Sequence, residues 1–315
     1  QEMSSGSRLQ NVNLKVRKTG IQRVTYEALV AAGINPNATL DKFLLTQRGV
    51  QVRIYSPART LVPGAFFEFY GEALDTVYTD TNVYQLQIGG RGSAPIPEVN
   101  GSASIVPMPP ASYTETFVLN RQLAYANYAP AEEAWYDTSM LAFTALQNWA
   151  FPFDLDALAD PSAPATVELV AWGVTDWPQS PDHHLVASLN GVAIADEIFD
   201  GLIEKRWTVD LPAGTLVNGA NALDLTLPGD TGVSWDLVNF DELRISYERS
   251  FQARDGRLKF TAQGADFVVT NLPDRDIVVY RLEPQGLRRL RNVRVTWNGS
   301  AYSATFAGHS QVATY

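Results

Sequence analysis

Residues 182 to 201 read DHHLVASLNGVAIADEIFDG and contain the pattern from which the fold of the central region is inferred. Two runs of alternating apolar and polar residues lie on either side of the Asn190-Gly191 pair. Alternation puts every second side chain on the same face of a β-strand, and Asn-Gly is a typical two-residue hairpin turn. The stretch therefore predicts a β-hairpin with one buried face.

Two of the three histidines of the chain, His183 and His184, are adjacent in this stretch. Neighbouring residues of a strand point to opposite faces, so the two rings are not expected to chelate one ion together. The stretch also lacks the H-E-x-x-H spacing of zinc peptidases. We expect one ring to face the core and donate to a backbone carbonyl, and the other to face solvent. Ligand binding at a sandwich edge is the alternative interpretation, and a metal site is the third.

Strand patterns of the same kind occur on both sides of this hairpin. The alternating runs are YTETFVLNRQLAY (113–125), ATVELVAWGVT (165–175) and NALDLTLPG (221–229). Short strands at intervals of about ten residues, separated by Asn-Gly and Pro-Gly turns, are typical of an antiparallel sandwich. Residues 111–249 are therefore predicted to form a jelly-roll β-sandwich.

The flanking segments predict two further β-rich modules, so that the whole chain is expected to be mainly β. Residues 1–110 combine alternating runs with a hairpin signal at Arg48-Gly49 and a short helix capped by Thr25 and stopped by Gly33. Residues 250–315 contain short strand patterns separated by turns, which predict a small C-terminal β-sandwich. A segment this short is marginal as an independent core, so we expect it to pack against its neighbour.

Composition excludes several classes of function. The 315-residue chain has a formal net charge of −10, and an acidic surface repels phosphate backbones, so no nucleic-acid partner is expected. It contains no cysteine, which removes disulfides, thiolate zinc sites and a cysteine nucleophile. The sequence contains no run of about 18 apolar residues, so no membrane-spanning helix is predicted. The first residues, QEMSSGSRLQ, are typical of a processed, exported chain or of a truncated one.

Five strings of the sequence resemble a known family in the same order along the chain. They are VTYEALVAAGI (24–34), FYGEALDTVYTDTNVYQL (69–86), HHLVASLNGVAIADEIFDG (183–201), GANALDLTLPGDTGVSWDLVNFDELRISYER (219–249) and DRDIVVYRLEP (274–284). Together they resemble the N-terminal, non-catalytic part of gingipain-like cysteine peptidases of the caspase clan, which bacteria secrete and often anchor at the cell surface. The resemblance implies a prodomain-like module followed by accessory sandwiches, at an extracellular or cell-surface location.

In that family a following domain supplies the catalytic cysteine and histidine. Because this chain has no cysteine, no catalytic residue carries over, and we expect the chain itself not to be an enzyme. The resemblance implies an accessory role in folding, latency or cell-surface assembly, with a downstream peptidase domain or other surface-protein subunits as partners. The alternative hypothesis is a carbohydrate-binding or adhesion module, since many such sandwiches combine an LNG turn with a later GAN turn.

The sequence alone leaves two kinds of candidate ligand site, one for a glycan and one for calcium. Trp177 lies in the polar loop TDWPQSPD, where an indole has less reason to be buried, so it is the main candidate for stacking on a glycan, with His183 and His184 nearby. Carboxylate and amide oxygens near turns are calcium ligands in principle, although Asx-turns explain them more simply and their spacing is not that of an EF-hand. The candidate calcium ligands are Asp75, Asp80, Asn82, Asp230, Asp236 and Asp241. No other cofactor is expected.

Overall fold

The computed structural model describes residues 10–35, 38–74, 76, 78–126 and 134–315. It is mainly β, with several sheets and one short α-helix, as the sequence predicts. Contacts group the chain into two compact units, of which the first comprises residues 1–101 and 278–292 and the second residues 102–277 and 293–315. The segment 250–315 thus contributes residues to both units. No helix in the described part of the chain is long and apolar enough to span a membrane.

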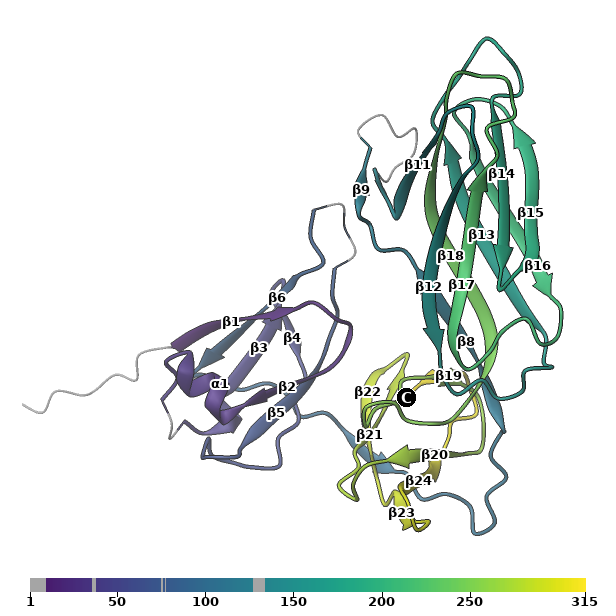
Figure 1. The fold of residues 1–315 in the computed structure, drawn as a ribbon. Helices are drawn as coiled ribbons and strands as arrows, with labels where there is room; N and C mark the ends of the chain where they lie inside the picture. Colours follow the sequence, from purple (N-terminus) through teal and green to yellow (C-terminus); the bar gives the residue numbers. More distant parts are fainter. Residues whose placement is uncertain (1–9, 36–37, 75, 77, 127–133) are drawn as a thin grey trace, which may run out of the picture. The chain divides into compact units, whose positions relative to one another are not determined.

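The first unit contains two antiparallel sheets, the paired strands β21, β22 and β7, and the helix. Its elements are β1 (Gln10–Val16), β2 (Gly20–Thr25), α1 (Tyr26–Ala31), the 3-10 turn η1 (Leu40–Lys42), β3 (Phe43–Gln47), β4 (Val50–Val52), β5 (Phe66–Gly71), β6 (Asn82–Ile88), β7 (Glu98–Asn100), β21 (Val279–Glu283) and β22 (Gly286–Arg291). The strand order of the larger sheet is β1-β6-β3-β4, and β2 pairs with β5 (Figure 1).

The local signals of this unit are confirmed. The Thr25 side chain accepts a hydrogen bond from the Ala28 backbone N–H at 3.3 Å and caps α1, as an N-cap residue does. Gly33 follows the helix with φ +86°, a conformation that favours glycine. Arg48 and Gly49 both have positive φ and connect β3 to β4 in a tight hairpin.

A buried carboxylate connects the C-terminal hairpin of this unit to its N-terminal strands. Glu68 is only 3% exposed, and its side chain accepts a hydrogen bond from Arg23 Nε at 2.8 Å and one from the Tyr280 hydroxyl. The Arg289 guanidinium lies over the ring of Tyr55, 4.3 Å from its centroid. Strand β22 also pairs with β7 in parallel. Two segments 191 residues apart in the sequence therefore form one sheet.

The second unit is built around a β-sandwich. Its strands are β8 (Ser112–Leu119), β11 (Thr138–Ala142), β12 (Gln147–Leu155), β13 (Ala165–Gly173), β14 (His183–Leu189), β15 (Val192–Phe199), β16 (Glu204–Leu211), β17 (Gly219–Leu227) and β18 (Asp236–Ser250). Strands β9 (Ala124–Tyr125) and β10 (Trp135–Tyr136) form a separate two-stranded sheet. One sheet has the order β11-β18-β13-β16, with β8 pairing further along β18, and the other has the order β12-β17-β14-β15.

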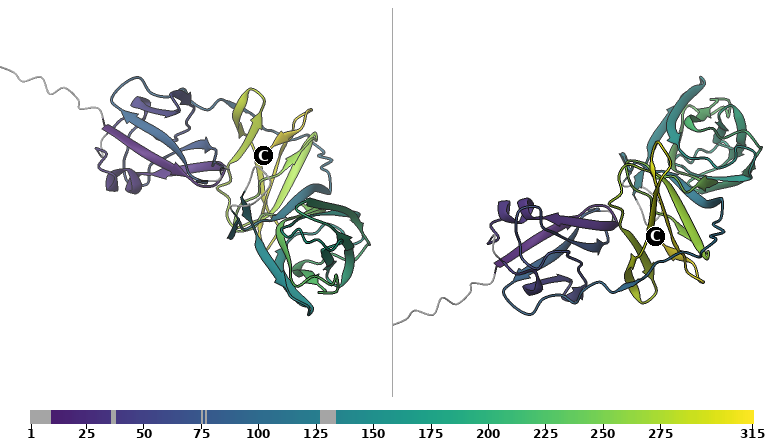
Figure 2. Two further views of the ribbon diagram at one scale, coloured as in Figure 1. Left: turned by 90° about the horizontal axis from the view of Figure 1, so that it is seen from above. Right: turned by 90° about the horizontal axis from the view of Figure 1, so that it is seen from below.

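The pairing order of the eight strands from β11 to β18 is that of a jelly roll. Numbered one to eight in chain order, the strands pair as 1-8-3-6 in one sheet and 2-7-4-5 in the other, and every pair is antiparallel. The views along the sandwich show the two sheets facing each other (Figure 2). The predicted central sandwich and its hairpin are thus confirmed, with Asn190 and Gly191 at φ 48° and 79°.

Alternating side chains from both sheets fill the space between them. Leu185, Leu225 and Leu243 are fully buried, and Phe151 packs on Phe240 with ring centroids 4.7 Å apart. Burial of such apolar area is the main favourable term in the stability of a sandwich. The polar faces of the same strands are left to solvent, which is why the alternation is so regular in the sequence.

The remaining strands of the second unit surround an aromatic cluster. They are β19 (Thr261–Ala262), β20 (Asp266–Leu272), β23 (Arg294–Trp297), β24 (Tyr302–Ala307) and β25 (Ala313–Thr314). Phe260 stacks on Tyr315 with centroids 5.0 Å apart and contacts Phe267 at 5.1 Å. Tyr113 of β8 lies 5.5 Å from Phe260, so the cluster packs against the sandwich, as its small size predicts.

The core leucines give a direct test of the sandwich. We expect Leu243→Ala to lower the free energy of unfolding of the second unit by about 2–5 kcal/mol, because it leaves a cavity at a fully buried site. The matched control is Leu141→Ala on β11, where the side chain is 41% exposed and the expected loss is below about 1 kcal/mol. Urea unfolding followed by tryptophan fluorescence measures both, and equal losses would contradict this packing.

Candidate functional site

The histidine pair lies at one end of the sandwich, where β14 begins. Alternation along β14 turns His183 into the interior, where it is fully buried, and turns His184 outward, with 14% of its side chain exposed. The two rings therefore lie on opposite faces of the strand, as predicted. The loop before β14, the turn after β15 and the start of β18 meet around His183.

Both ring nitrogens of His183 face hydrogen-bond acceptors. Nδ1 is 2.6 Å from a carboxylate oxygen of Asp236, and Nε2 is 3.2 Å from the Thr175 carbonyl oxygen. Nε2 is also 3.4 Å from Asp182 Oδ1, and the ring stacks on Phe199 at 4.7 Å. A ring with two acceptors is satisfied only when both nitrogens carry protons. The geometry therefore favours the charged imidazolium, and the predicted bond to a backbone carbonyl is present.

The surroundings of His183 change its pKa in two opposing ways. Burial lowers the pKa, because a low-dielectric interior disfavours the charged ring. The hydrogen bond and charge of Asp236, together with the charge of Asp182, raise it, and the net pKa is above the ordinary value. Asp182 and Asp236 are themselves at most 2% exposed. The three side chains thus form a buried charged cluster.

This cluster fixes the loops at its end of the sandwich. The Asp182 carboxylate accepts hydrogen bonds from the backbone N–H of Trp177 at 3.0 Å and of Gly201 at 2.8 Å. A Cβ atom on Gly173 would lie 2.4 Å from the Gly201 carbonyl oxygen and 2.5 Å from His183 Nε2. Only glycine fits at that position. The space around the imidazolium is therefore filled by protein groups, and the cluster acts as a structural connection between loops.

His184 forms a second, separate bridge on the outer face. Its Nδ1 lies 2.8 Å from Asp230 Oδ1 and its Nε2 lies 3.0 Å from Asp196 Oδ1. Burial lowers its pKa, but the hydrogen bonds to the two carboxylates outweigh this, and the net pKa is raised. Both carboxylate side chains are more than half exposed, so salt and solvent screen this bridge.

Trp177 lies in the loop beside this cluster and is half-buried. Its indole N–H donates to the Trp235 carbonyl oxygen at 2.9 Å, and its ring packs edge-to-face on the Trp235 ring at 5.5 Å. These contacts hold two loops together. The glycan-stacking role stays a prediction.

The candidate calcium ligands belong to different parts of the fold. Asp230 is hydrogen-bonded to His184 and Asp236 to His183, whereas Asp241 lies within β18. Asp80 accepts from the Thr81 hydroxyl at 2.7 Å, whereas Asn82 donates to the Glu72 carbonyl oxygen at 2.8 Å. Asp75 lies outside the described residues. Among those that are described, no group of three or more His, Asp or Glu side chains is arranged to hold a metal ion. Calcium binding stays a prediction.

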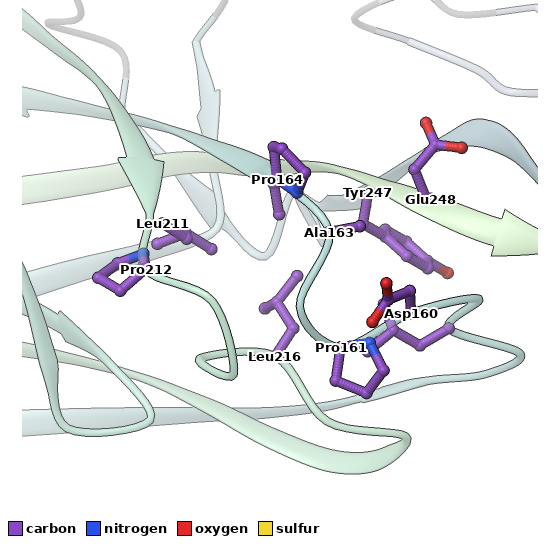
Figure 3. A pocket seen from close by; sticks show the side chains of 11 residues that line it. Asp160, Pro161, Ala163, Pro164, Leu211, Pro212, Leu216, Tyr247 and Glu248 are labelled. Carbon is purple, nitrogen blue, oxygen red and sulfur yellow. The ribbon is translucent and has the colours of Figure 1, made fainter.

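A small hollow and a larger groove lie in the described part of the second unit, and the groove was missed from the sequence. The smaller, of about 10 Å³, lies among prolines and leucines of the loops after β12 and β16 (Figure 3) and has room for one water at most. The larger is a groove of about 370 Å³ between β8, the end of β12, the end of β18 and the turn 254–259. The run RDGRLK in that turn, basic in an acidic chain, was the available signal.

Because the pKa of His183 is raised, we expect the stability of the second unit to depend on pH. A group whose pKa is higher in the folded than in the unfolded chain stabilises the fold fully below the unfolded pKa, about 6.5, and loses that contribution as pH rises through the folded value. We expect the urea midpoint of the second unit to fall as the pH rises above about 6.5, and His183→Gln to reduce this fall. His309→Gln, at the third histidine, is the control. An unchanged pH dependence in the His183 variant would contradict the charged cluster.

Comparison with known proteins gives a similarity of fold. No family model matches the chain, and no curated protein matches its sequence. Among solved structures, dimeric latent PorU from Porphyromonas gingivalis matches with a TM-score of 0.67 and 13% identity, over 97% of this chain and 31% of PorU. The chain thus spans about a third of the length of PorU.

Other matches are much weaker. The ectodomain of ANX2 from Arabidopsis thaliana has a TM-score of 0.26 and 10% identity, over 76% of this chain and 83% of that one. The β-porphyranase BpGH86A from Bacteroides plebeius has a TM-score of 0.25 and 12% identity, over 78% of this chain and 35% of that one. At these levels of identity, the match to PorU concerns the fold alone, and the other two support no inference.

Proposed function

We propose that this chain is a non-catalytic, prodomain-like accessory region of a longer gingipain-like peptidase that acts outside the bacterial cell. The observation that carries the proposal is the similarity of fold to latent PorU over 97% of the chain, although the chain spans only 31% of PorU. The family resemblance of the sequence strings points to the same class of protein as this structural neighbour. The absence of cysteine is consistent with a region that leaves cysteine chemistry to another part of the protein.

The proposed role is to hold a peptidase domain latent and to assist its folding. PorU was crystallised in a latent form, which motivates the choice of latency over adhesion. The architecture suits a rigid partner surface, because the jelly-roll core and the buried cluster around His183 fix strands and loops together. Rigid surfaces bind with a smaller loss of conformational entropy than mobile ones.

The experiment is to add the purified chain to the peptidase domain encoded with it, expressed separately. We expect slower hydrolysis of a fluorogenic peptide, or a higher yield of soluble domain when the two are co-expressed. The control is the Leu243→Ala chain, which should lose the effect at a temperature where it is unfolded. If neither rate nor yield changes, or if the gene encodes no peptidase domain, the proposal is wrong.

The glycan hypothesis is separable from this one. If the chain tethers the protein to a carbohydrate, a glycan array should give signals that Trp177→Ala weakens about tenfold or more, because stacking on an aromatic ring supplies much of such affinity. Trp297→Ala is the matched control, since this indole is 55% exposed and lies on β23, outside the eight-stranded sandwich that carries Trp177. Absence of any glycan signal from the parent chain would remove the tethering role.

A further inference from the structure

The groove of the second unit is open to solvent along the edge of the sandwich. Its lining comes from β8, the end of β12, the end of β18 and the turn 254–259 that follows β18. With a volume of about 370 Å³ it is large enough for several residues of a peptide. The lining residues are Glu115, Thr116, Phe117, Val118, Asp154, Asp156, Tyr247, Arg249, Arg254, Arg257, Leu258 and Lys259.

Strand β8 offers an unpaired edge to this groove. It pairs with β18 on one side, and among the described strands it has no neighbour on the other. Every second residue of such an edge directs its backbone N–H and C=O away from the sheet. Phe117 stacks on Phe153 at 4.8 Å and closes the sandwich behind the edge. The groove therefore combines free backbone groups with an apolar wall.

Cationic side chains from β18 and from the turn 254–259 line the same groove. Arg249, only 5% exposed, is fixed by the Tyr113 hydroxyl at 2.6 Å and by Asp156 at 2.8 Å. Arg257 and Lys259 are exposed and have no ion-pair partner among the described residues. Four cations and three carboxylates line the groove, in a chain whose formal net charge is −10. The lining thus carries a net charge of +1, and because Asp156 forms ion pairs with Arg249 and, at 4.0 Å, with Arg254, the cations left for a ligand are chiefly Arg257 and Lys259.

The turn that carries these cations is preorganised. Arg254 and Arg257 exchange two backbone hydrogen bonds of 2.9 Å across Asp255-Gly256, whose φ values are 50° and 73°. Two positive φ values in succession define a type I′ turn, which holds its flanking residues side by side. The two arginines therefore start from neighbouring positions before any ligand arrives, which lowers the entropic cost of using them together.

We propose that this groove binds an extended acidic polypeptide, which adds as a strand to β8 and places its carboxylates against Arg254, Arg257 and Lys259. Strand addition uses main-chain hydrogen bonds for affinity and alternate side chains for specificity. In a peptide that alternates apolar and acidic residues, one face would pack on Phe117 and Leu258 while the other meets the cations. Charge complementarity selects an acidic peptide over a neutral or basic one.

The probe is an eight-residue peptide of alternating valine and glutamate with an N-terminal fluorescein, titrated with the 315-residue chain and followed by fluorescence anisotropy. Two comparison peptides separate the parts of the proposal. One alternates valine and lysine, and the other keeps glutamate but has every second amide N-methylated, which blocks strand pairing without changing charge. We expect the valine–glutamate peptide to bind best and the two comparison peptides to bind at least about tenfold more weakly. We also expect the affinity of the valine–glutamate peptide to fall with added salt.

The variant is the double change Arg257→Glu with Lys259→Glu, at two exposed positions, and circular dichroism confirms that it folds. We expect it to raise the Kd of the acidic peptide by about tenfold or more. The matched control is Arg275→Glu with Arg294→Glu, which makes the same change in net charge at exposed positions outside the groove lining and should leave the Kd within about twofold.

Several results would overturn the proposal. Equal losses in the two double variants would mean that only net charge matters, and no loss in the groove variant would place the peptide elsewhere. Equal binding of the N-methylated peptide would exclude strand addition. If heparin binds to the groove cations and the acidic peptide does not, the site belongs to anionic polysaccharides. None of these results depends on whether a peptidase domain accompanies the chain, so this proposal and the proposed function fail independently.

Discussion

The pairing of β18 on both of its edges is the constraint on which the second unit depends. This 15-residue strand pairs along one edge with β13, and along the other first with β11 and then with β8. Its apolar residues run through the centre of the core, while Asp236 stands at its start and Arg249 near its end. Thirteen residues of extended strand span roughly 40 Å. The histidine cluster and the groove are therefore well separated and share a single rigid element.

A buried charged side chain lies at each end of β18, and each of the two forms an ion pair. Asp236 faces the imidazolium of His183, and Arg249 faces Asp156 and the Tyr113 hydroxyl. Removing one member of such a pair leaves an uncompensated charge in the interior, whereas the intact pair adds little net stability over an apolar replacement. We therefore interpret the pairs as devices that fix which loops meet at each end. The apolar core between them supplies the stability.

Local features of the fold could be predicted from the sequence because they depend on neighbouring residues. The alternation around Asn190-Gly191 predicted the hairpin and the opposite orientations of His183 and His184, and Thr25 predicted the helix cap. The order of the strands is the order of a jelly roll, which their spacing and turns also indicated.

Contacts between distant segments could not be predicted in the same way. Asp236 is 53 residues from His183, and the parallel pair of β7 with β22 joins two regions that share no sequence signal. Periodicity reports the conformation and the buried face of a strand but not its partner, since many strands have the same pattern. For the same reason, the acidic residues considered for calcium were grouped by sequence proximity, and the structure places them with different partners.

The two edges of the β18 sheet differ in a way that bears on the groove. The opposite edge strand, β16, carries charged residues along its length, and its Arg206 forms ion pairs with Glu168 and Glu204. Charged side chains on an edge strand are a common protection against unwanted pairing with another chain. Strand β8, SYTETFVL, has one charged residue, Glu115, and its outward positions are threonine and valine. The exposed cations of the groove lie on a separate turn, residues 254–259. A sheet that protects one edge with several charged side chains, and leaves the other with Glu115 alone beside the cations of the turn, retains an edge that can accept an acidic strand.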